Sequence, residues 1–254
     1  MIEVQQLSKR FTQGRGKKAR TVQAVDGVSF TAADGRITGL LGPNGAGKTT
    51  TLRMLAALLV PDAGRLRVDG IDVQRAPQAA LARMGVLSDA RGLYPRLTAR
   101  ENIVYYGRLH GMSQSAASQR AETLAHLLDM KPLLERRTEG FSQGERMKTA
   151  LARAMVHNPP NIILDEPTNG LDVLATRALR DALRRLRDIE GKCVVFSTHI
   201  MQEVERLCDR VIVIAHGRTV AEGTVASLNA QCAERDFEES FVKLAFSAEE
   251  RTQA

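Results

Sequence analysis

Short apolar runs bounded by turn residues recur along the chain and predict β-strands. They cover Ile2–Leu7, Val22–Phe30, Ile37–Leu41, Ile162–Leu164, Cys193–Ser197 and Val211–Ile214. Segments with helical periodicity separate the last three runs, which predicts parallel strands joined by crossover helices. By contrast, Leu66–Val73 holds an Asp-Gly pair between two short apolar stretches, which predicts an antiparallel hairpin.

The middle of the chain, from about Thr98 to Met155, has helical periodicity almost throughout. Thr98–Glu101 has the pattern of a capping box, so a helix is expected from there to His110, ending at Gly111. A second helix is expected over Ser115–Met130. A third begins at Ser142, with an apolar stripe formed by Met147, Leu151, Ala154 and Met155.

Gly42–Thr49 matches the phosphate-binding pattern G-x-x-x-x-G-K-[ST] and follows a predicted strand. Glycines let successive backbone N–H groups converge on one anion, and the helix that follows, expected over Lys48–Leu59, adds its dipole. Lys48 is expected to reach the β- and γ-phosphates, and the Thr49 hydroxyl to bind Mg²⁺. The predicted contact residues of this loop are Gly42, Pro43, Asn44, Gly45, Ala46, Gly47, Lys48, Thr49 and Thr50.

Two adjacent carboxylates, Asp165 and Glu166, follow the buried run Ile162–Leu164. The structural alternative is a strand that simply enters an exposed acidic loop. Beside a phosphate loop, however, Asp165 is expected to face Mg²⁺ and Glu166 to activate a water for attack on the γ-phosphate. His199 follows another parallel strand, whose carboxyl end should lie at the same sheet edge, so a γ-phosphate contact is favoured over a structural role.

These patterns predict an α/β fold with a P-loop NTPase core, which is a mixed, mainly parallel sheet with flanking helices. An antiparallel β part at the N-terminus and a helical lobe inserted at about residues 90–155 complete the ATPase domain, expected over residues 1–223. Residues 224–254 are expected to form a C-terminal tail with a small amphipathic helix over Phe237–Phe246 and a flexible end.

Composition narrows the classes of partner. The net charge of +7 permits an anionic partner, but the basic run over residues 15–20 is flanked by apolar segments and is interpreted as a solvated hairpin loop. Aromatic residues make up only 4%, which leaves little for base stacking, and no nucleic acid is expected. The three cysteines have no metal-ligand spacing and indicate a reducing compartment. No signal peptide is predicted, and no run approaches the roughly 18 apolar residues that cross a bilayer.

The chain resembles the nucleotide-binding domain of ABC transporters. The resemblance rests on five motifs that follow one another in the family's order, which are Gly42–Thr49, Phe141–Glu145, Ile162–Glu166, Gly170–Asp172 and His199. The resemblance implies that Phe11 stacks on adenine. It also implies that Ser142, Gly144 and Glu145 contact ATP held by a second copy of the chain, with Asp172 at that interface. The implied assembly is a head-to-tail dimer that hydrolyses Mg²⁺-ATP on the cytoplasmic face of a membrane, where its helical lobe docks on an integral membrane permease.

The chain departs from the family pattern at three positions. Gln143 and Glu145 replace residues of the usual Leu-Ser-Gly-Gly-Gln, although both are polar and Gly144 is kept. In the loop that joins core and lobe, Asp89 is the nearest match to the usual glutamine. A carboxylate there is able to contact Mg²⁺ or its water, but it repels the γ-phosphate.

Finer features resemble the ATPase subunits of ABC-2 exporters, above all those of NatAB-type sodium efflux systems. They are Gly92–Asn102 and Phe237–Leu244. The resemblance implies export, with sodium as one cargo and a drug, lipid or polysaccharide as alternatives. Two other functions stay open from the sequence. One is a soluble ABC ATPase acting on ribosomes or DNA, and the other is a regulator that binds ATP without turnover.

Overall fold

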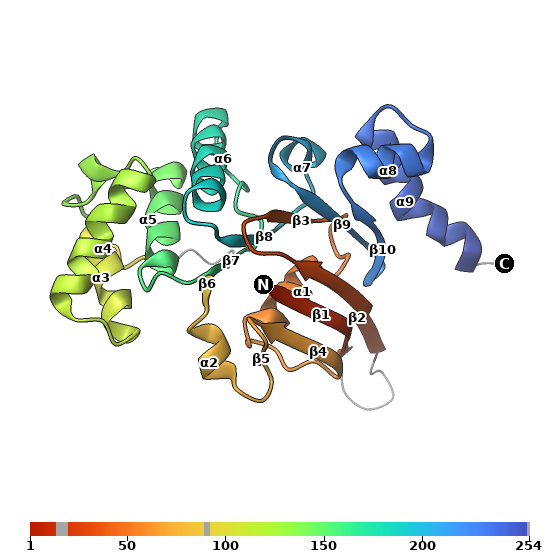
Figure 1. Cartoon of the computed structure of the whole chain (residues 1–254), viewed down its shortest axis with the longest axis horizontal. Helices are drawn as coiled ribbons and strands as arrows, with labels where there is room; N and C mark the ends of the chain where they lie inside the picture. Colours follow the sequence, from red (N-terminus) through yellow and green to blue (C-terminus); the bar gives the residue numbers. More distant parts are fainter. Residues whose placement is uncertain (14–19, 89–91, 253–254) are drawn as a thin grey trace.

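The computed structural model describes residues 1–13, 20–88 and 92–252 of the chain. Two β-sheets form the centre, with helices grouped at one end and along the mixed sheet (Figure 1). The larger sheet has the strand order β10-β9-β3-β8-β7-β6, and the smaller has the order β2-β1-β4-β5. The predicted α/β class with an additional antiparallel part is therefore confirmed.

The larger sheet is parallel from β6 to β9, with β10 antiparallel at its edge. Its strands are β3 (Ile37–Leu41), β6 (Met84–Leu87), β7 (Asn161–Leu164), β8 (Cys193–Thr198), β9 (Arg210–Ala215) and β10 (Arg218–Gly223). Every residue of β3, β7 and β8 is buried, as expected for central parallel strands covered on both faces. The parallel strands predicted from the apolar runs are thus present.

The smaller sheet is antiparallel and consists of β1 (Ile2–Gln13), β2 (Arg20–Ala32), β4 (Ala63–Val68) and β5 (Ile71–Asp72). The hairpin between β4 and β5 turns at Asp69 and Gly70, whose φ angles of 50° and 77° are both left-handed. Those angles belong to the tight hairpin turn that an Asp-Gly pair favours, so the predicted hairpin is confirmed. Most of the basic loop predicted over residues 15–20 lies outside the described residues.

The two faces of the larger sheet have different neighbours. Val194 and Phe196 of β8 pack into a core with the helical lobe, whereas Cys193 and Val195 pack with the smaller sheet and with Leu52 of helix α1. This alternation follows from the period of two along a strand. The phosphate-loop helix α1 (Lys48–Leu55) is shorter than the predicted Lys48–Leu59, because Ala57 adopts a left-handed φ of 55° and ends it.

The helical lobe contains α3 (Ala99–Leu109), α4 (Gln114–Leu127), a 3-10 turn (Lys131–Leu133) and α5 (Gln143–Met155). Thr98 and Ser142 begin α3 and α5 with complete capping boxes, in which Glu101 and Glu145 bond back to the cap residue. The predicted starts of these two helices are therefore confirmed. Helix α2 (Pro77–Leu81) precedes β6, and α6 (Val173–Asp188) and α7 (Met201–Leu207) follow β7 and β8.

After β10 the chain forms α8 (Val225–Cys232) and α9 (Phe237–Thr252), which lie beside β9 and β10 (Figure 1). Phe237, Phe241 and Ala245 are buried against Leu41, Val211 and Val213. Residues after 223 therefore continue the core on the edge of the larger sheet. Within the described residues, we find no helix with the length and apolar character needed to cross a membrane.

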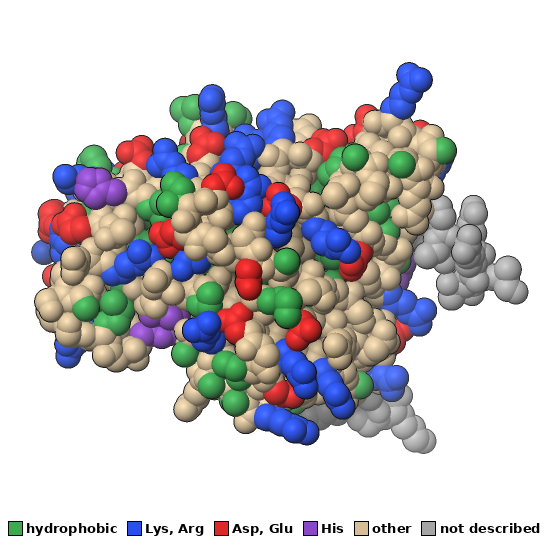
Figure 2. All heavy atoms as spheres, viewed as in Figure 1, with side chains coloured by type: hydrophobic (Ala, Val, Ile, Leu, Met, Phe, Trp, Pro, Cys, Tyr) green, Lys and Arg blue, Asp and Glu red, His purple; other side chains and the backbone are tan. Residues whose placement is uncertain are grey.

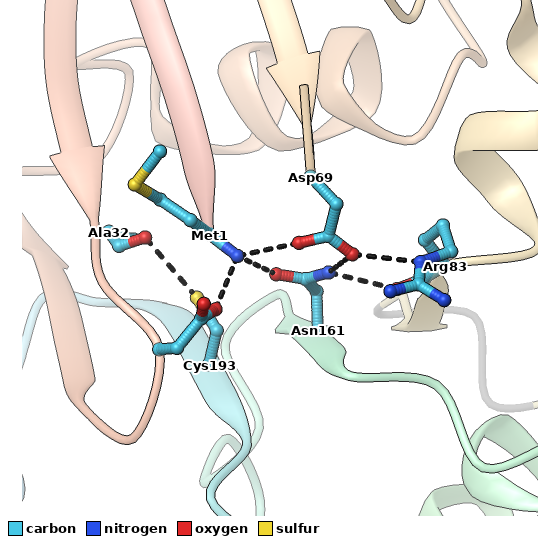
Figure 3. A network of polar contacts seen from close by, with 7 residues as sticks. Met1, Ala32, Asp69, Arg83, Asn161 and Cys193 are labelled. Carbon is cyan, nitrogen blue, oxygen red and sulfur yellow. Dashed lines mark hydrogen bonds and ion pairs between the residues drawn. The ribbon is translucent and has the colours of Figure 1, made fainter. Parts of the chain in front are cut away.

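A polar network joins the two sheets where β7 begins (Figure 3). Buried Asn161 donates from Nδ2 to Asp69 Oδ2 at 3.0 Å and to the Arg83 carbonyl at 3.1 Å. Its Oδ1 accepts from the Met1 amino group at 3.1 Å. Burial opposes ionisation of Asp69, but hydrogen bonds from Met1 and Arg83 outweigh it and lower the pKa of this carboxyl. The network holds the start of β7, the strand that leads to Asp165.

We expect Asn161→Ala to lower the free energy of unfolding by about 2–3 kcal/mol, because it leaves buried polar groups without partners. Urea denaturation measures this change. Gln78→Ala, an exposed change of the same kind on α2, is the control and should stay within about 0.5 kcal/mol of the unaltered protein. Equal effects of the two substitutions would contradict a role for the network.

Candidate active site

Strands β3, β7 and β8 end at one edge of the larger sheet. Leu41, the last residue of β3, pairs with Thr198, and Leu164, the last residue of β7, pairs with Phe196. The residues that follow, Gly42, Asp165 and His199, therefore begin their loops at nearly the same level. This edge at the carboxyl ends of parallel strands is where open α/β sheets bind ligands.

The phosphate loop is held closely against its neighbours. Gly47 has a left-handed φ of 102°, and a Cβ atom there would lie 2.5 Å from the Ala24 carbonyl oxygen of β2. Gly42 is equally confined, since its Cβ would lie 2.1 Å from the Ile214 carbonyl oxygen of β9. Only glycine fits at either position. The loop therefore brings its backbone N–H groups together at the start of α1, as an anion cradle requires.

Lys48 and Thr49 extend from the first turn of α1. The nearly buried Lys48 ammonium donates to the carbonyl oxygens of Gly42 at 2.7 Å and Pro43 at 3.1 Å, and it lies 3.5 Å from Glu166 Oε1. The Thr49 hydroxyl donates to Asp165 Oδ1 at 3.1 Å. The loop and the strand end of β7 thus meet directly.

Glu166 has a left-handed backbone, with φ of 46°. A non-glycine residue in this region costs about 1–3 kcal/mol, and such residues cluster at functional sites. Its Oε2 lies 2.8 Å from Nδ1 of His199, while its Oε1 faces Lys48. The carboxylate is therefore held between an imidazole and an ammonium group.

These groups surround a cavity of about 290 Å³. It is lined by Ala24, Asn44, Gly45, Ala46, Gly47, Lys48, Thr49, Thr50, Glu166, Asn169 and His199. Of the residues predicted from the sequence, residues 44–50, Glu166 and His199 line this cavity. Gly42 and Pro43 do not line it, but their carbonyl oxygens accept from Lys48, and Asp165 accepts from Thr49. The arrangement offers converging N–H groups and a buried cation to a phosphate, and a carboxylate to a nearby water.

The Thr49 and Asp165 side chains fit a magnesium ion. Mg²⁺ prefers oxygen ligands and is typically bound through one or two carboxylates together with substrate phosphates. A hydroxyl and a carboxylate oxygen 3.1 Å apart, next to the phosphate loop, supply that donor set. The third predicted ligand, Asp89, lies outside the described residues.

The predicted contacts with a second chain lie at the start of α5 and α6. Among the described residues that line the cavity, none comes from residues 142–145. Ser142 caps α5, and Asp172 caps α6 by accepting from the Ala175 N–H at 2.8 Å. A Cβ on Gly144 would lie 2.9 Å from the Ala175 Cβ, so this glycine allows the two helices to approach within one chain.

Glu145 carries a charge that Arg136 balances. Its Oε2 accepts from the Ser142 N–H and its Oε1 from Arg136, both at 2.8 Å. These two contacts, first the backbone one, lower the pKa of Glu145. Arg136 also lies 5.2 Å from the centre of the Phe141 ring. The carboxylate that this chain has at position 145, where the family usually has glutamine, is therefore paired with Arg136 and held by the Ser142 N–H.

Phe11 lies on β1 opposite Val22 of β2, with the Lys9 ammonium 5.9 Å from its ring centre. It is not among the described residues that line the cavity, and its contact with adenine stays a prediction. Ala24 and Asn169 in the cavity wall were not predicted, because no pattern in the sequence singles them out. Ser197 was not predicted either, although a polar residue inside an apolar strand is a signal that the sequence offers.

Comparison with known proteins agrees with this geometry. The family model described as ABC transporter matches residues 25–169. The ABC transporter ATP-binding protein NatA of Bacillus subtilis is 44% identical over 229 residues, which are 90% of this chain and 91% of that protein. A Nod factor export ATP-binding protein I of Paraburkholderia xenovorans is 43% identical over 204 residues, which are 80% of this chain and 67% of that one.

Solved structures are similar as well. One described as the ATP-binding subunit of an ABC transporter has a TM-score of 0.81 at 28% identity, over 96% of this chain and 98% of that one. A dimeric bacterial ABC transporter cassette has a TM-score of 0.78 at 25% identity, over 88% and 98%. The fold and the site define a P-loop ATPase, and the matches show that the chain belongs to the ABC transporter family. It is the ATP-binding, ATP-hydrolysing subunit of such a transporter.

We expect Lys48→Ala to weaken ATP binding at least about tenfold, because the charge-assisted contact of a nearly buried ammonium group with phosphate is lost. Titration with a fluorescent ATP analogue measures the affinity. The matched control is Lys131→Ala, which removes the same charge from an exposed position in the lobe. Unaltered affinity in Lys48→Ala would overturn the assignment of the phosphate loop.

Proposed function

We propose that two copies of this chain close head to tail around Mg²⁺-ATP and power an exporter through an integral membrane permease. The observation that carries the proposal is the convergence of Lys48, Glu166 and His199 on one cavity at the phosphate loop. A dimeric solved relative supports the pairing.

In this mechanism each side chain has a separate task. Backbone N–H groups of the phosphate loop and Lys48 bind the phosphates, and Thr49 with Asp165 holds Mg²⁺. When bound, Mg²⁺ neutralises charge on the β- and γ-phosphate oxygens. Glu166 accepts a proton from the attacking water, and His199 orients the Glu166 carboxylate through the 2.8 Å contact. We include Asp89 as a ligand of the metal or its water.

The second half of each ATP site comes from the other copy. The caps of α5 and α6 lie outside the cavity of their own chain, so the roles proposed for Ser142, Gly144, Glu145 and Asp172 require a partner. The N-terminus of α5 favours an anion through its helix dipole. ATP bound at one chain is the anion that this helix end would meet on closure. Phe11 is proposed to stack on the adenine.

Glu166→Gln is expected to reduce ATP hydrolysis at least about 100-fold, because the amide cannot accept the proton from water. ATP affinity should stay within about threefold, since phosphate binding rests on other groups. With hydrolysis blocked, size-exclusion chromatography in Mg²⁺-ATP should show a dimer.

Glu205→Gln, an exposed change on α7, is the control and should hydrolyse ATP normally. Full activity in Glu166→Gln would defeat the proposed mechanism. A monomer that binds ATP tightly but never pairs would defeat the head-to-tail arrangement.

The permease is proposed to dock beside the helical lobe. A groove of about 610 Å³ lies there, and its lining includes Leu93, Pro95, Thr138, Gln143 and Asn169. Next to it, the exposed rings of Tyr94 and Tyr105 meet edge to face with centres 5.5 Å apart. Grooves of this kind bind amphipathic helices. Asn169 lines both the groove and the cavity at the phosphate loop, so the proposed docking site and the proposed ATP site have one residue in common.

We propose that the docked chain is a peripheral subunit on the cytoplasmic face of the membrane. Relatives named for Nod factor export support the direction of transport. We propose sodium as the cargo from the resemblance to NatAB-type systems, with a Nod-factor-like molecule as the alternative. On the face drawn in Figure 2, basic side chains are interspersed with acidic ones, which gives little support to a role on nucleic acid.

Purification of the tagged chain from its own membranes should recover an integral membrane protein with several spans. Tyr105→Asp should reduce that recovery severalfold and leave the ATPase rate of the isolated chain unchanged, because the charge falls on the docking surface alone. Val242→Asp on α9 is the control, since Val242 is 46% exposed and Tyr105 is 43% exposed. Equal recovery with all three proteins would place the permease elsewhere.

A further inference from the structure

The Ser197 hydroxyl lies inside the apolar strand β8. All six residues of this strand are buried, and Ser197 has no exposed surface. The register of β7 and β8 pairs Leu164 with Phe196, so Ser197 lies level with Asp165 at the end of the neighbouring strand. A polar group in this position has to be satisfied by its neighbours because water does not reach it.

Two hydrogen bonds satisfy it, and their directions are determined. The backbone N–H of Glu166 donates to Ser197 Oγ at 2.9 Å, since an amide N–H is only a donor. The hydroxyl hydrogen is then left for Asp165 Oδ1, which accepts it at 2.6 Å. One side chain therefore contacts both members of the Asp165-Glu166 pair.

These contacts hold the part of the site that has an unfavourable backbone conformation, which is Glu166. Glu166 is left-handed, and its N–H direction depends on the peptide that joins it to Asp165. The bond to Ser197 holds that peptide, and with it the direction in which the Glu166 side chain leaves the backbone. On the other side, Asp165 Oδ1 accepts from Thr49 as well as Ser197, so the same hydroxyl helps to orient the proposed metal ligand.

We propose that Ser197 is a positioning residue for hydrolysis, which locks the carboxylate that faces Mg²⁺ and the carboxylate that activates water into one arrangement. The inference rests on the roles proposed above for Asp165 and Glu166. Ser197 itself touches neither nucleotide nor water. Its effect follows from geometry, because a displacement of about 1 Å at a reacting group is enough to lower a rate about 100-fold.

The test uses three substitutions in the full chain. Ser197→Ala removes the hydroxyl, Ser197→Cys fills the same space with a weak hydrogen-bonding group, and Ser197→Thr keeps a hydroxyl. Thr38→Val is the matched control. The Thr38 hydroxyl is buried in neighbouring β3 and has no hydrogen-bond partner among the described residues.

We expect kcat of Ser197→Ala and Ser197→Cys to fall about tenfold or more, with KM for ATP changed less than about twofold. Ser197→Thr should recover kcat to within about threefold of the unaltered chain. A fluorescent ATP analogue should bind Ser197→Cys normally in EDTA, and the gain in affinity on adding Mg²⁺ should be reduced. Thermal unfolding verifies that each variant is folded.

Three results would overturn the proposal. They are an unchanged kcat in folded Ser197→Cys, an equal loss in Thr38→Val, and no recovery in folded Ser197→Thr. If Ser197→Ala fails to fold, Ser197→Cys decides the outcome, because it leaves no cavity. The proposed function is tested separately, since a dead Glu166→Gln beside a fully active Ser197→Cys removes this inference and leaves the mechanism standing.

Discussion

The parallel pairing of β3, β8 and β7 is the constraint on which the rest of the site depends. It brings the end of β3 to the same edge as the ends of β7 and β8, which lie more than a hundred residues further along the chain, so that Gly42, Asp165 and His199 follow strand ends at nearly the same level. Burial of these strands on both faces makes the register stiff, because a slip by one residue exchanges the two cores. The positions of Lys48 and Glu166 follow from that register.

Close approach of the loops then converts the sheet edge into a cavity for phosphate. The glycines at 42 and 47 let the loop lie against backbone carbonyls of β9 and β2, and α1 begins there with the helix end that favours an anion. Lys48 and His199 contact the Glu166 carboxylate from two sides. Electrostatic catalysis depends on such preorganisation, in which charged groups are in place before the phosphate charge shifts.

In the proposed dimer the chain supplies one half of each ATP site. Its cavity is lined by phosphate-loop residues, Glu166 and His199, while Ser142 and Asp172 cap α5 and α6 outside that cavity. At the N-terminus of α5 Glu145 would oppose an incoming phosphate, but its hydrogen bonds to the Ser142 N–H and to Arg136 anchor and balance it. Arg136 thus keeps an acidic substitution compatible with the proposed role of this helix end.

The sequence alone determined the elements and the chemistry of the loop, because apolar periodicity, the Asp-Gly turn at residue 69 and the spacing of Gly42–Thr49 are local properties. It also placed the starts of α3 and α5, since capping boxes span only four residues. It overestimated α1, whose end depends on a left-handed Ala57.

Only the tertiary structure decided that Asn169 lines the cavity, that Arg136 balances Glu145 and that Ser197 joins Asp165 to Glu166. The physical reason is that each of these contacts depends on how loops and strands distant in sequence are packed. Propensity and spacing describe a segment by itself, whereas a hydrogen bond across strands is set by their register.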